Sequence, residues 1–193
     1  MPPVDPNDVL MTGENSFIRL SKDGGQTQST RLSHWRVDWC PAGAGHALFA
    51  QSELTDGQVR VYSDSAAVAR WLQRTIETYL FPAFADTDLP VIPATFARTG
   101  DPRGTTTESI TSRDGTLNMT WYDHLPAFVL TVPPGQPPER PIGVFSTFFP
   151  ARSAQVELNG RFAEGKPWKE MRGDRESSSA CLAWSETWVA PRG

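Results

Sequence analysis

The chain has 193 residues, of which 38% are hydrophobic and 21% charged, and this balance is typical of one folded domain with a real core. Its net charge of −4 is spread along the chain without a basic stripe, which argues against binding to nucleic acid or to an anionic membrane surface. No run approaches about 18 apolar residues and the start lacks a secretory signal pattern, so we expect a cytoplasmic protein.

The first part of the chain alternates apolar and polar side chains, which is typical of β-strands. Residues 1–15 carry early prolines and acidic residues without a clear period, and we expect them to form an irregular arm. Strands are predicted at residues 16–20, 30–40, 46–54 and 59–62. Asp56-Gly57 predicts a hairpin turn between the last two, since both residues tolerate positive φ.

The period changes at residues 65–81, where apolar side chains recur at three- and four-residue steps and predict a helix. Ser65 offers an N-cap side chain, and Pro82 ends the helix. The apolar stripe should cover one end or one face of the sheet, whereas Gln73 and Glu77 are predicted to point away from it.

The second part of the chain again predicts strands, with hairpin turns at Asp114-Gly115 and Asn159-Gly160. Short strands at regular spacing with a single helix predict a single, mainly β domain, either an antiparallel β-barrel or a two-sheet sandwich. In general architecture the expected barrel resembles the calycins. The expected strands cover residues 94–98, 105–112, 117–123, 128–132, 142–149, 154–158 and 177–189.

Motifs for metals, nucleotides and covalent nucleophiles are missing from the sequence. The two cysteines, Cys40 and Cys181, stand alone and are expected to be buried free thiols. His34, His46 and His124 show no metal-binding spacing. We therefore expect neither a metal nor a cofactor.

Four carboxylates lie in step with apolar neighbours along predicted strands: Glu53, Glu108, Asp123 and Glu186. Side chains in step share a face, so these groups are predicted to point toward the core. A buried carboxylate is paired, or protonated with a raised pKa, or faces a wet pocket, and the last two states suit a general acid or base. The alternative is that each lies at a strand end and reaches solvent or an arginine.

Tyr122 and His124 flank Asp123, and they share a pocket with it only if the chain bends before Pro126. His124 is therefore either a pocket acid or base or an exposed turn residue, and His46, just after a glycine-containing turn, has the same alternatives.

The strand at residues 30–40 has two faces of different character. Trp35 lies with apolar neighbours on one face, and His34, Arg36 and Asp38 share the other. This polar face either lines a cavity or forms the solvated outside of the strand. We favour the solvated outside, with Trp35 facing inward.

By exclusion, we expect a cofactor-independent enzyme that performs acid/base chemistry, as a lyase, hydratase, isomerase or cyclase, on a small hydrophobic or aromatic metabolite in a β-barrel cavity. The alternatives are a non-catalytic protein that binds a small hydrophobic ligand, and an interaction module with a filled core. A homodimer is an open alternative. The catalytic candidates are Asp123, Glu186, His124, His46 and Tyr122, and the candidates for substrate binding are Trp35, Arg36, Glu53, Trp121, Phe128 and Trp184.

Overall fold

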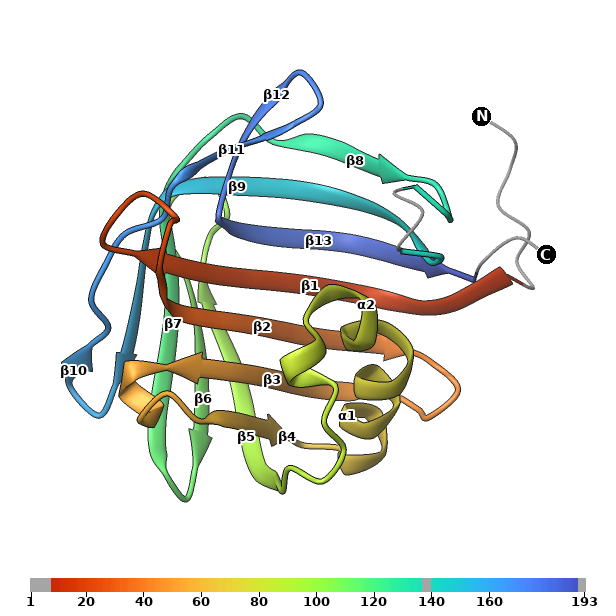
Figure 1. The fold of residues 1–193 in the computed structure, drawn as a ribbon, viewed down its shortest axis with the longest axis horizontal. Helices are drawn as coiled ribbons and strands as arrows, with labels where there is room; N and C mark the ends of the chain where they lie inside the picture. Colours follow the sequence, from red (N-terminus) through yellow and green to blue (C-terminus); the bar gives the residue numbers. More distant parts are fainter. Residues whose placement is uncertain (1–7, 137–139, 191–193) are drawn as a thin grey trace.

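A computed structural model describes residues 8–136 and 140–190, most of which lie in strands (Figure 1). The helical elements are η2 (Glu53–Thr55), α1 (Ala66–Leu72), η3 (Gln73–Glu77), α2 (Thr78–Leu80) and η4 (Pro82–Phe84). The strands are β1 (Val9–Ser21), β2 (Gln28–Trp39), β3 (Gly45–Ser52), β4 (Val59–Ser63), β5 (Val91–Gly100), β6 (Thr106–Ser112), β7 (Gly115–His124), β8 (Phe128–Val132), β9 (Gly143–Leu158), β10 (Arg161–Phe162), β11 (Lys169–Arg172), β12 (Arg175–Ser178) and β13 (Ala180–Val189).

Nine strands close into a barrel in the order β9-β13-β1-β2-β3-β4-β5-β6-β7, with β7 pairing back to β9. The long strand β9 closes the ring because its two halves have different partners. Residues 143–150 pair with β13, and residues 151–158 pair with β7. Strand β8 pairs with the first half of β9 outside this ring. The prediction of a mainly β barrel is confirmed.

The barrel is mixed, so the prediction of a purely antiparallel barrel is wrong at one pair. Strands β4 and β5 run parallel, with Val61 opposite Val91 and Tyr62 opposite Ile92. Parallel neighbours need a crossover connection rather than a tight turn. The helical segment between β4 and β5 provides this crossover and lies against the outer wall of the barrel (Figure 1).

The N-terminal prediction is wrong for residues 9–15, because β1 already begins at Val9, whereas residues 1–7 lie outside the described part of the chain. Gly13 explains how a strand with polar interruptions pairs here. A Cβ atom at Gly13 would lie 2.0 Å from the carbonyl oxygen of Arg36, and its φ is +153°. The register of β1 against β13 also shifts after Gly13, so a glycine-containing bulge replaces the expected irregular arm.

The predicted helix is confirmed as a helical run from Ala66 to Leu80, with the Ser65 hydroxyl accepting a hydrogen bond from the Val68 N–H. Its middle, residues 73–77, is a π-helical turn, which changes the phase of the side chains. Gln73 and Glu77 are consequently fully buried, and the prediction that they point away from the barrel is wrong.

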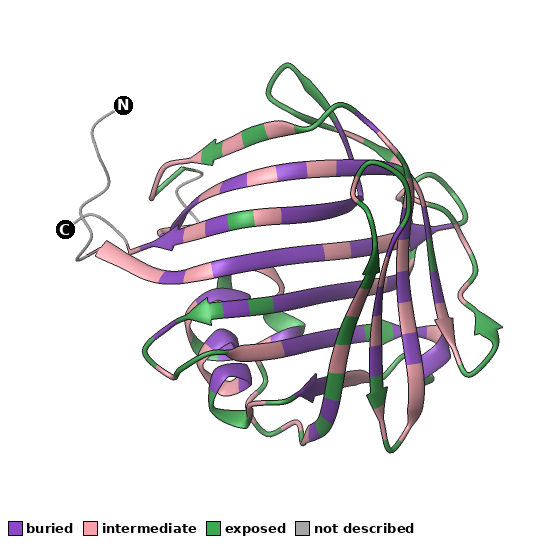
Figure 2. Ribbon diagram, turned by 180° about the vertical axis from the view of Figure 1, so that it is seen from behind, coloured by how far each residue is buried: buried purple, intermediate pink, exposed green. Residues whose placement is uncertain are grey.

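Buried residues occur along most strands of the barrel (Figure 2). The apolar ones form separate clusters on the two faces of the barrel wall. Leu32 belongs to the cluster that fills the lumen, whereas Trp35 of the same strand packs with the helix on the outer wall. Side chains alternate between the two faces along β2, but burial alone does not show whether a residue faces the lumen or the outer wall. Cys40 and Cys181 are both buried and free, as predicted. The described part of the chain contains no helix with the length and hydrophobicity needed to cross a bilayer.

Candidate functional site

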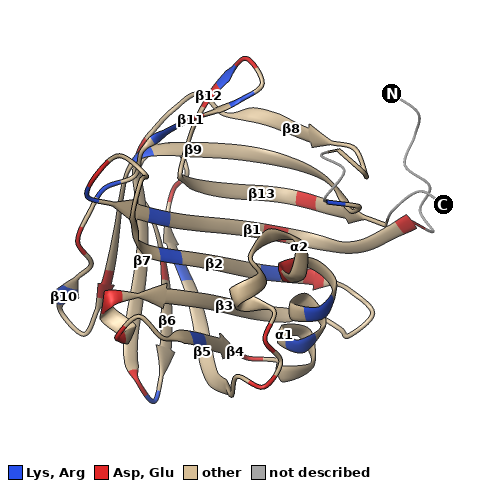
Figure 3. Cartoon of the chain, viewed as in Figure 1, with Lys and Arg blue, Asp and Glu red and all other residues tan. Residues whose placement is uncertain are grey.

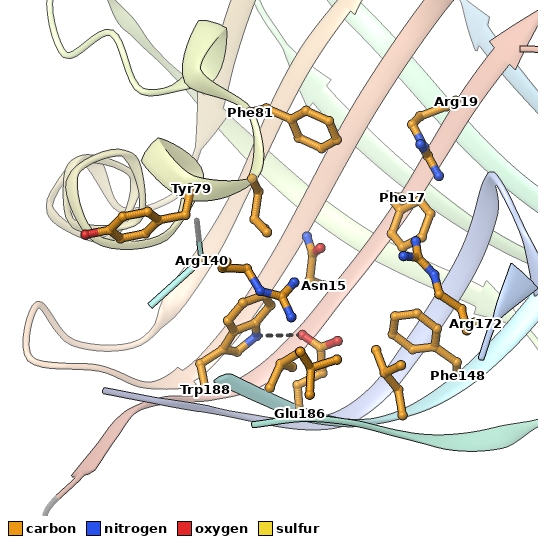
Figure 4. Close-up of a pocket in the computed structure, with 14 residues that line it drawn as sticks. Asn15, Phe17, Arg19, Tyr79, Phe81, Arg140, Phe148, Arg172, Glu186 and Trp188 are labelled. Atoms are coloured by element: carbon orange, nitrogen blue, oxygen red, sulfur yellow. Dashed lines mark hydrogen bonds between the residues drawn. The ribbon is translucent and has the colours of Figure 1, made fainter. Parts of the chain in front are cut away.

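A groove of about 430 Å³ lies outside the barrel, between the helical segment and strand β8 (Figure 4). We call it the outer groove. Phe81 forms its wall on the helix side, Leu130 on β8 and Phe148 on β9 form the opposite wall, and Glu186 and Trp188 of β13 form the floor. The groove is therefore apolar at its walls and polar at its floor.

A β-bulge in β13 places the floor residues on the outer face. Ser185 has a φ of 55°, and the register of β13 against β9 shifts between Trp184 and Thr187. This extra residue turns Glu186 and Trp188 outward, whereas Trp184 stays in the lumen. The predicted burial of Glu186 is confirmed, but it faces the outer groove rather than the barrel interior.

Glu186 is the only acidic residue on β13 (Figure 3), and this residue is only 3% exposed. The indole Nε1 of Trp188 donates a hydrogen bond to its Oε2 at 2.9 Å. Burial raises the pKa of Glu186 to about 8, although the Trp188 hydrogen bond favours the ionised form. At neutral pH this carboxyl group is mostly protonated and can act as a hydrogen-bond donor.

Arg140 lies on the same floor, and its guanidinium group points toward Glu186 and Trp188 (Figure 4). Burial lowers the pKa of Arg140, and the nearby Arg172 lowers it further, whereas Glu186 raises it. Its Nε is buried and has no hydrogen-bond partner among the described residues. An unpartnered buried donor is costly, and Arg19 Nε at the edge of the groove is in the same state.

Arg19 and Arg172 stand at the edge of the outer groove and share one carboxylate. Glu170 Oε2 lies 2.7 Å from Arg19 Nη2 and 3.3 Å from Arg172 Nη2. Arg19 also lies over the rings of Phe17 and Trp168. These contacts hold two positive charges beside the groove.

A second group of charged residues lies inside the lumen, and we call it the luminal charge cluster: Glu14, His34, Arg98 and Glu108. Arg98 Nη1 lies 2.7 Å from Glu14 Oε2, and Arg98 Nε lies 3.2 Å from Glu108 Oε2. His34 is 1% exposed, with Nε2 at 3.6 Å from Glu108 Oε1. Burial lowers the pKa of His34 and raises that of Glu108. The preferred prediction that His34 faces solvent is wrong, and the polar-lining alternative holds for this residue.

His46 and Trp184 lie beside the luminal charge cluster rather than in the outer groove. His46 Nδ1 lies 2.7 Å from Asp64 Oδ2, and its ring stacks on Phe96. The guanidinium of Arg98 lies over the Trp184 ring at 4.9 Å. Both candidate residues are therefore close to ionisable groups, but on the other side of the barrel wall from Glu186.

Asp123 does not point toward the core, and the alternative that it reaches solvent or an arginine holds. Its φ of 55° breaks the alternation of β7, and its side chain is 56% exposed with Arg152 at 3.9 Å. Tyr122 and His124 pair with β9, opposite Ser153 and Ala151. Burial lowers the pKa of His124. None of these three neighbours lines the outer groove.

Of three further candidates for substrate binding, Trp35 and Glu53 are placed differently from the prediction, whereas Arg36 is exposed, in line with the preferred interpretation of its strand face. Trp35 does not face the lumen: it packs under the helix, and its Nε1 donates to Glu77 Oε1 at 2.6 Å. Arg36 is 48% exposed, beside Asp38. Glu53 sits in the turn η2, where it accepts a hydrogen bond from the Glu164 N–H, so its predicted inward aim is wrong.

The two remaining candidates lie on opposite faces of the wall. Trp121 is buried in the lumen, and its Nε1 donates to the Phe17 carbonyl at 3.1 Å. Phe128 packs against Phe148 with ring centroids 6.0 Å apart, so it supports one wall of the outer groove. Of all the predicted site residues, only Glu186 lines this groove.

Sequence reasoning missed Asn15, Arg140 and Arg172 as site residues. Arg140 follows a proline-rich loop, and Asn15 lies in the expected arm, so no periodic pattern marks either residue. The one available signal is the alternation of Glu186 with Trp188, which places an acid and an indole on one face.

Comparisons with protein-family models, curated proteins and solved structures find no match to this chain. Within residues 8–136 and 140–190, no group of three or more His, Cys, Asp or Glu side chains is arranged to hold a metal ion.

Proposed function

We propose that this chain binds a small, largely apolar molecule in the outer groove. The observation that carries the proposal is a groove of about 430 Å³ whose walls are apolar and whose floor holds one buried carboxyl group. This volume and this combination of apolar walls with few polar groups are typical of small-molecule sites. The site lies on the outer wall rather than in the lumen, where tightly packed apolar side chains form the main core.

The test uses N-phenyl-1-naphthylamine, an uncharged apolar dye whose fluorescence rises in apolar sites. Leu130→Gln puts an amide into the groove wall and should weaken dye binding at least threefold, because the amide loses hydration on ligand binding. Val129→Gln is the matched control, since Val129 lies on the other face of β8 and is 73% exposed. Absence of dye binding, or equal loss in both variants, would overturn the proposal.

A second candidate function is proton-transfer catalysis in the same groove, as a lyase, hydratase, isomerase or cyclase without a cofactor. The observation that favours it is the raised pKa of Glu186, about 8, because a carboxyl group protonated at neutral pH suits a general acid. Incubation of a bound ligand in D₂O should then introduce deuterium detectable by mass spectrometry. Glu186→Gln should abolish this exchange and leave dye binding intact, and exchange that persists in the variant contradicts the role.

We also propose a compartment, an architecture and an oligomeric state, each on a single observation. The buried free thiols of Cys40 and Cys181 support a reducing compartment such as the cytoplasm. The closed barrel supports a calycin-type architecture. The exposed Val129 on β8 supports a homodimer, which sedimentation analysis tests by the mass of the particle in solution.

A further inference from the structure

We infer that the ligand of the outer groove is an amphipathic monoanion with a carboxylate head group, which binds between Arg140 and Glu186. This inference rests on the proposed small-molecule site and adds the charge of its ligand. It depends on three properties of the described residues: the balance of charge around the groove, the free donor on Arg140 and the hydrogen bonding of Glu186.

The charge around the groove is positive, although the whole chain carries a net charge of −4. Three guanidinium groups line the groove, from Arg19, Arg140 and Arg172. Glu170 supplies one carboxylate, which Arg19 and Arg172 share. Glu186 supplies little negative charge at neutral pH, because its pKa is raised. An anion is therefore attracted to this groove, and a cation is repelled.

The second property is the position of Arg140. Its side chain reaches over the floor in Figure 4, and its Nε is buried without a partner among the described residues. A guanidinium group presents parallel N–H donors that match the two oxygens of a carboxylate. None of the ion pairs formed within residues 8–136 and 140–190 includes Arg140. A ligand carboxylate beside the guanidinium group would balance its charge.

The third property is the state of Glu186. Trp188 Nε1 donates to Oε2 of this carboxyl group, and the Ser146 hydroxyl and the Asn15 N–H also favour its ionised form, whereas burial and the nearby Glu14 favour the protonated form. Burial has the largest effect, and the protonated carboxyl group can donate a hydrogen bond to an anionic oxygen beside Arg140. The ionised form would repel the same ligand. Protonated Glu186 thus favours an anionic ligand. Because Glu186 ionises as pH rises, we expect the anion to bind more weakly at high pH.

The apolar walls set the rest of the ligand. Phe81 from the helix side and Leu130, Val132 and Phe148 from the opposite side surround the space above the floor. An unbranched or aromatic apolar body would bury its surface there, while the carboxylate stays at the floor. A medium-chain carboxylate has this arrangement of a single charge and an apolar tail.

The experiment compares decanoate, 1-decanol, decyl sulfate and decyltrimethylammonium as competitors of N-phenyl-1-naphthylamine at pH 6.5. We expect decanoate to bind at least tenfold more tightly than 1-decanol and decyltrimethylammonium to bind more weakly than either. Equal affinity for decanoate and 1-decanol would overturn the inference. Tighter binding of decyl sulfate than of decanoate would overturn the carboxylate assignment, since a sulfate head group accepts a weaker hydrogen bond from protonated Glu186 than a carboxylate does.

Variants assign the head-group contacts. Arg140→Gln should weaken decanoate binding about tenfold and weaken binding of the uncharged 1-decanol much less. Arg152→Gln is the matched control, because Arg152 is 57% exposed beside Asp123, away from the groove. Wild-type affinity for decanoate should fall between pH 6.5 and 9, and Glu186→Gln should remove this fall. If the wild-type protein binds the dye but Arg140→Gln binds decanoate as tightly as wild type, the anion inference alone is overturned. If the wild-type protein does not bind the dye, the proposed site itself is overturned.

Discussion

The luminal charge cluster and the outer groove both bury charged side chains, but among the described residues the charges are paired with each other in the cluster and not on the floor of the groove. In the cluster, Arg98 lies between Glu14 at 2.7 Å and Glu108 at 3.2 Å, so positive and negative groups face each other. In the groove, Arg140 and Glu186 stand among apolar walls, and Arg140 forms no ion pair within residues 8–136 and 140–190. Paired charges support the barrel, whereas unpaired charges are available to a ligand.

The physical reason for this difference is the cost of removing charge from water. Such a cost is offset in the luminal charge cluster by neighbouring opposite charges. In the outer groove it is reduced because Glu186 takes up a proton, which its raised pKa of about 8 allows at neutral pH. The comparison therefore predicts large stability effects in the lumen and small stability effects with large binding effects in the groove.

The largest expected effect is that of Arg98→Met. Removing this guanidinium leaves Glu14 and Glu108 buried without a positive partner, which should lower the free energy of unfolding by about 3–5 kcal/mol. Urea denaturation at pH 7 measures the loss. Arg140→Met is the matched change in the groove and should cost less than about 1 kcal/mol. Equal losses in the two variants would contradict the distinction between the two regions.

Glu77→Leu should have the next largest effect. Within the described part of the chain, Glu77 has no ion-pair partner, unlike the luminal charges, but it is held by hydrogen bonds from neutral donors. It is fully buried under the helix, and it accepts hydrogen bonds from Trp35 Nε1 at 2.6 Å and Ser33 Oγ at 2.9 Å. Leucine leaves both donors without a partner, which should cost about 2–3 kcal/mol in thermal or urea unfolding.

Glu77→Gln is the control for that variant, because glutamine keeps an oxygen acceptor. Burial raises the pKa of Glu77 from 4.5 to about 7. The native state therefore holds this proton more tightly than the unfolded state, and stability contributed by the group is present below pH 4.5 and lost as pH rises to about 7. Glu77→Gln should remove this part of the pH dependence. An unfolding profile identical to wild type from pH 4.5 to 7.5 would contradict the buried, protonatable role.

The strands and the helix were predictable because their signals are local. Alternation marked β2 and β13, and three- and four-residue spacing marked the helix from Ala66 to Leu80. The burial of Glu186 was predictable for the same reason, since Trp188 lies two residues away on the same face. Hydrophobic periodicity therefore identifies which residues are buried within a strand.

The face of burial was not predictable, because the outer wall of the barrel is also covered. Trp35 is as buried as any luminal residue, but it lies on the outer wall, where the helix covers it. Positive φ values at Asp123 and Ser185 shift the phase of two strands, and these bulges have no periodic signal. Arg140 reaches the groove from a loop far in sequence from Asn15, so only the closed barrel brings the two together.

Glu186→Gln should have no large effect on stability at low pH and a stabilising effect at high pH. Burial raises the pKa of Glu186 from 4.5 to about 8, so the wild-type protein loses stability as pH rises between these values. Glutamine cannot ionise and still accepts the Trp188 hydrogen bond. The variant should match wild type near pH 4.5 and exceed its free energy of unfolding at pH 9, by up to about 5 kcal/mol for a shift of this size. A variant less stable than wild type at pH 9 would show that an ionised Glu186 is paired, as in the luminal charge cluster.

The smallest effect should come from Asp123→Asn, which changes a charge outside both regions. Asp123 is 56% exposed, and its ion pair with Arg152 spans 3.9 Å, so solvent screens the interaction. Its φ of 55° also suits asparagine, which adopts the left-handed conformation more readily than most residues. The free energy of unfolding should change by less than about 0.5 kcal/mol, with dye and decanoate binding unchanged. If Asp123→Asn lowers the free energy of unfolding by more than about 1 kcal/mol, an exposed charge matters to stability as much as a buried one. Burial would then not explain the contrast between the lumen and the groove.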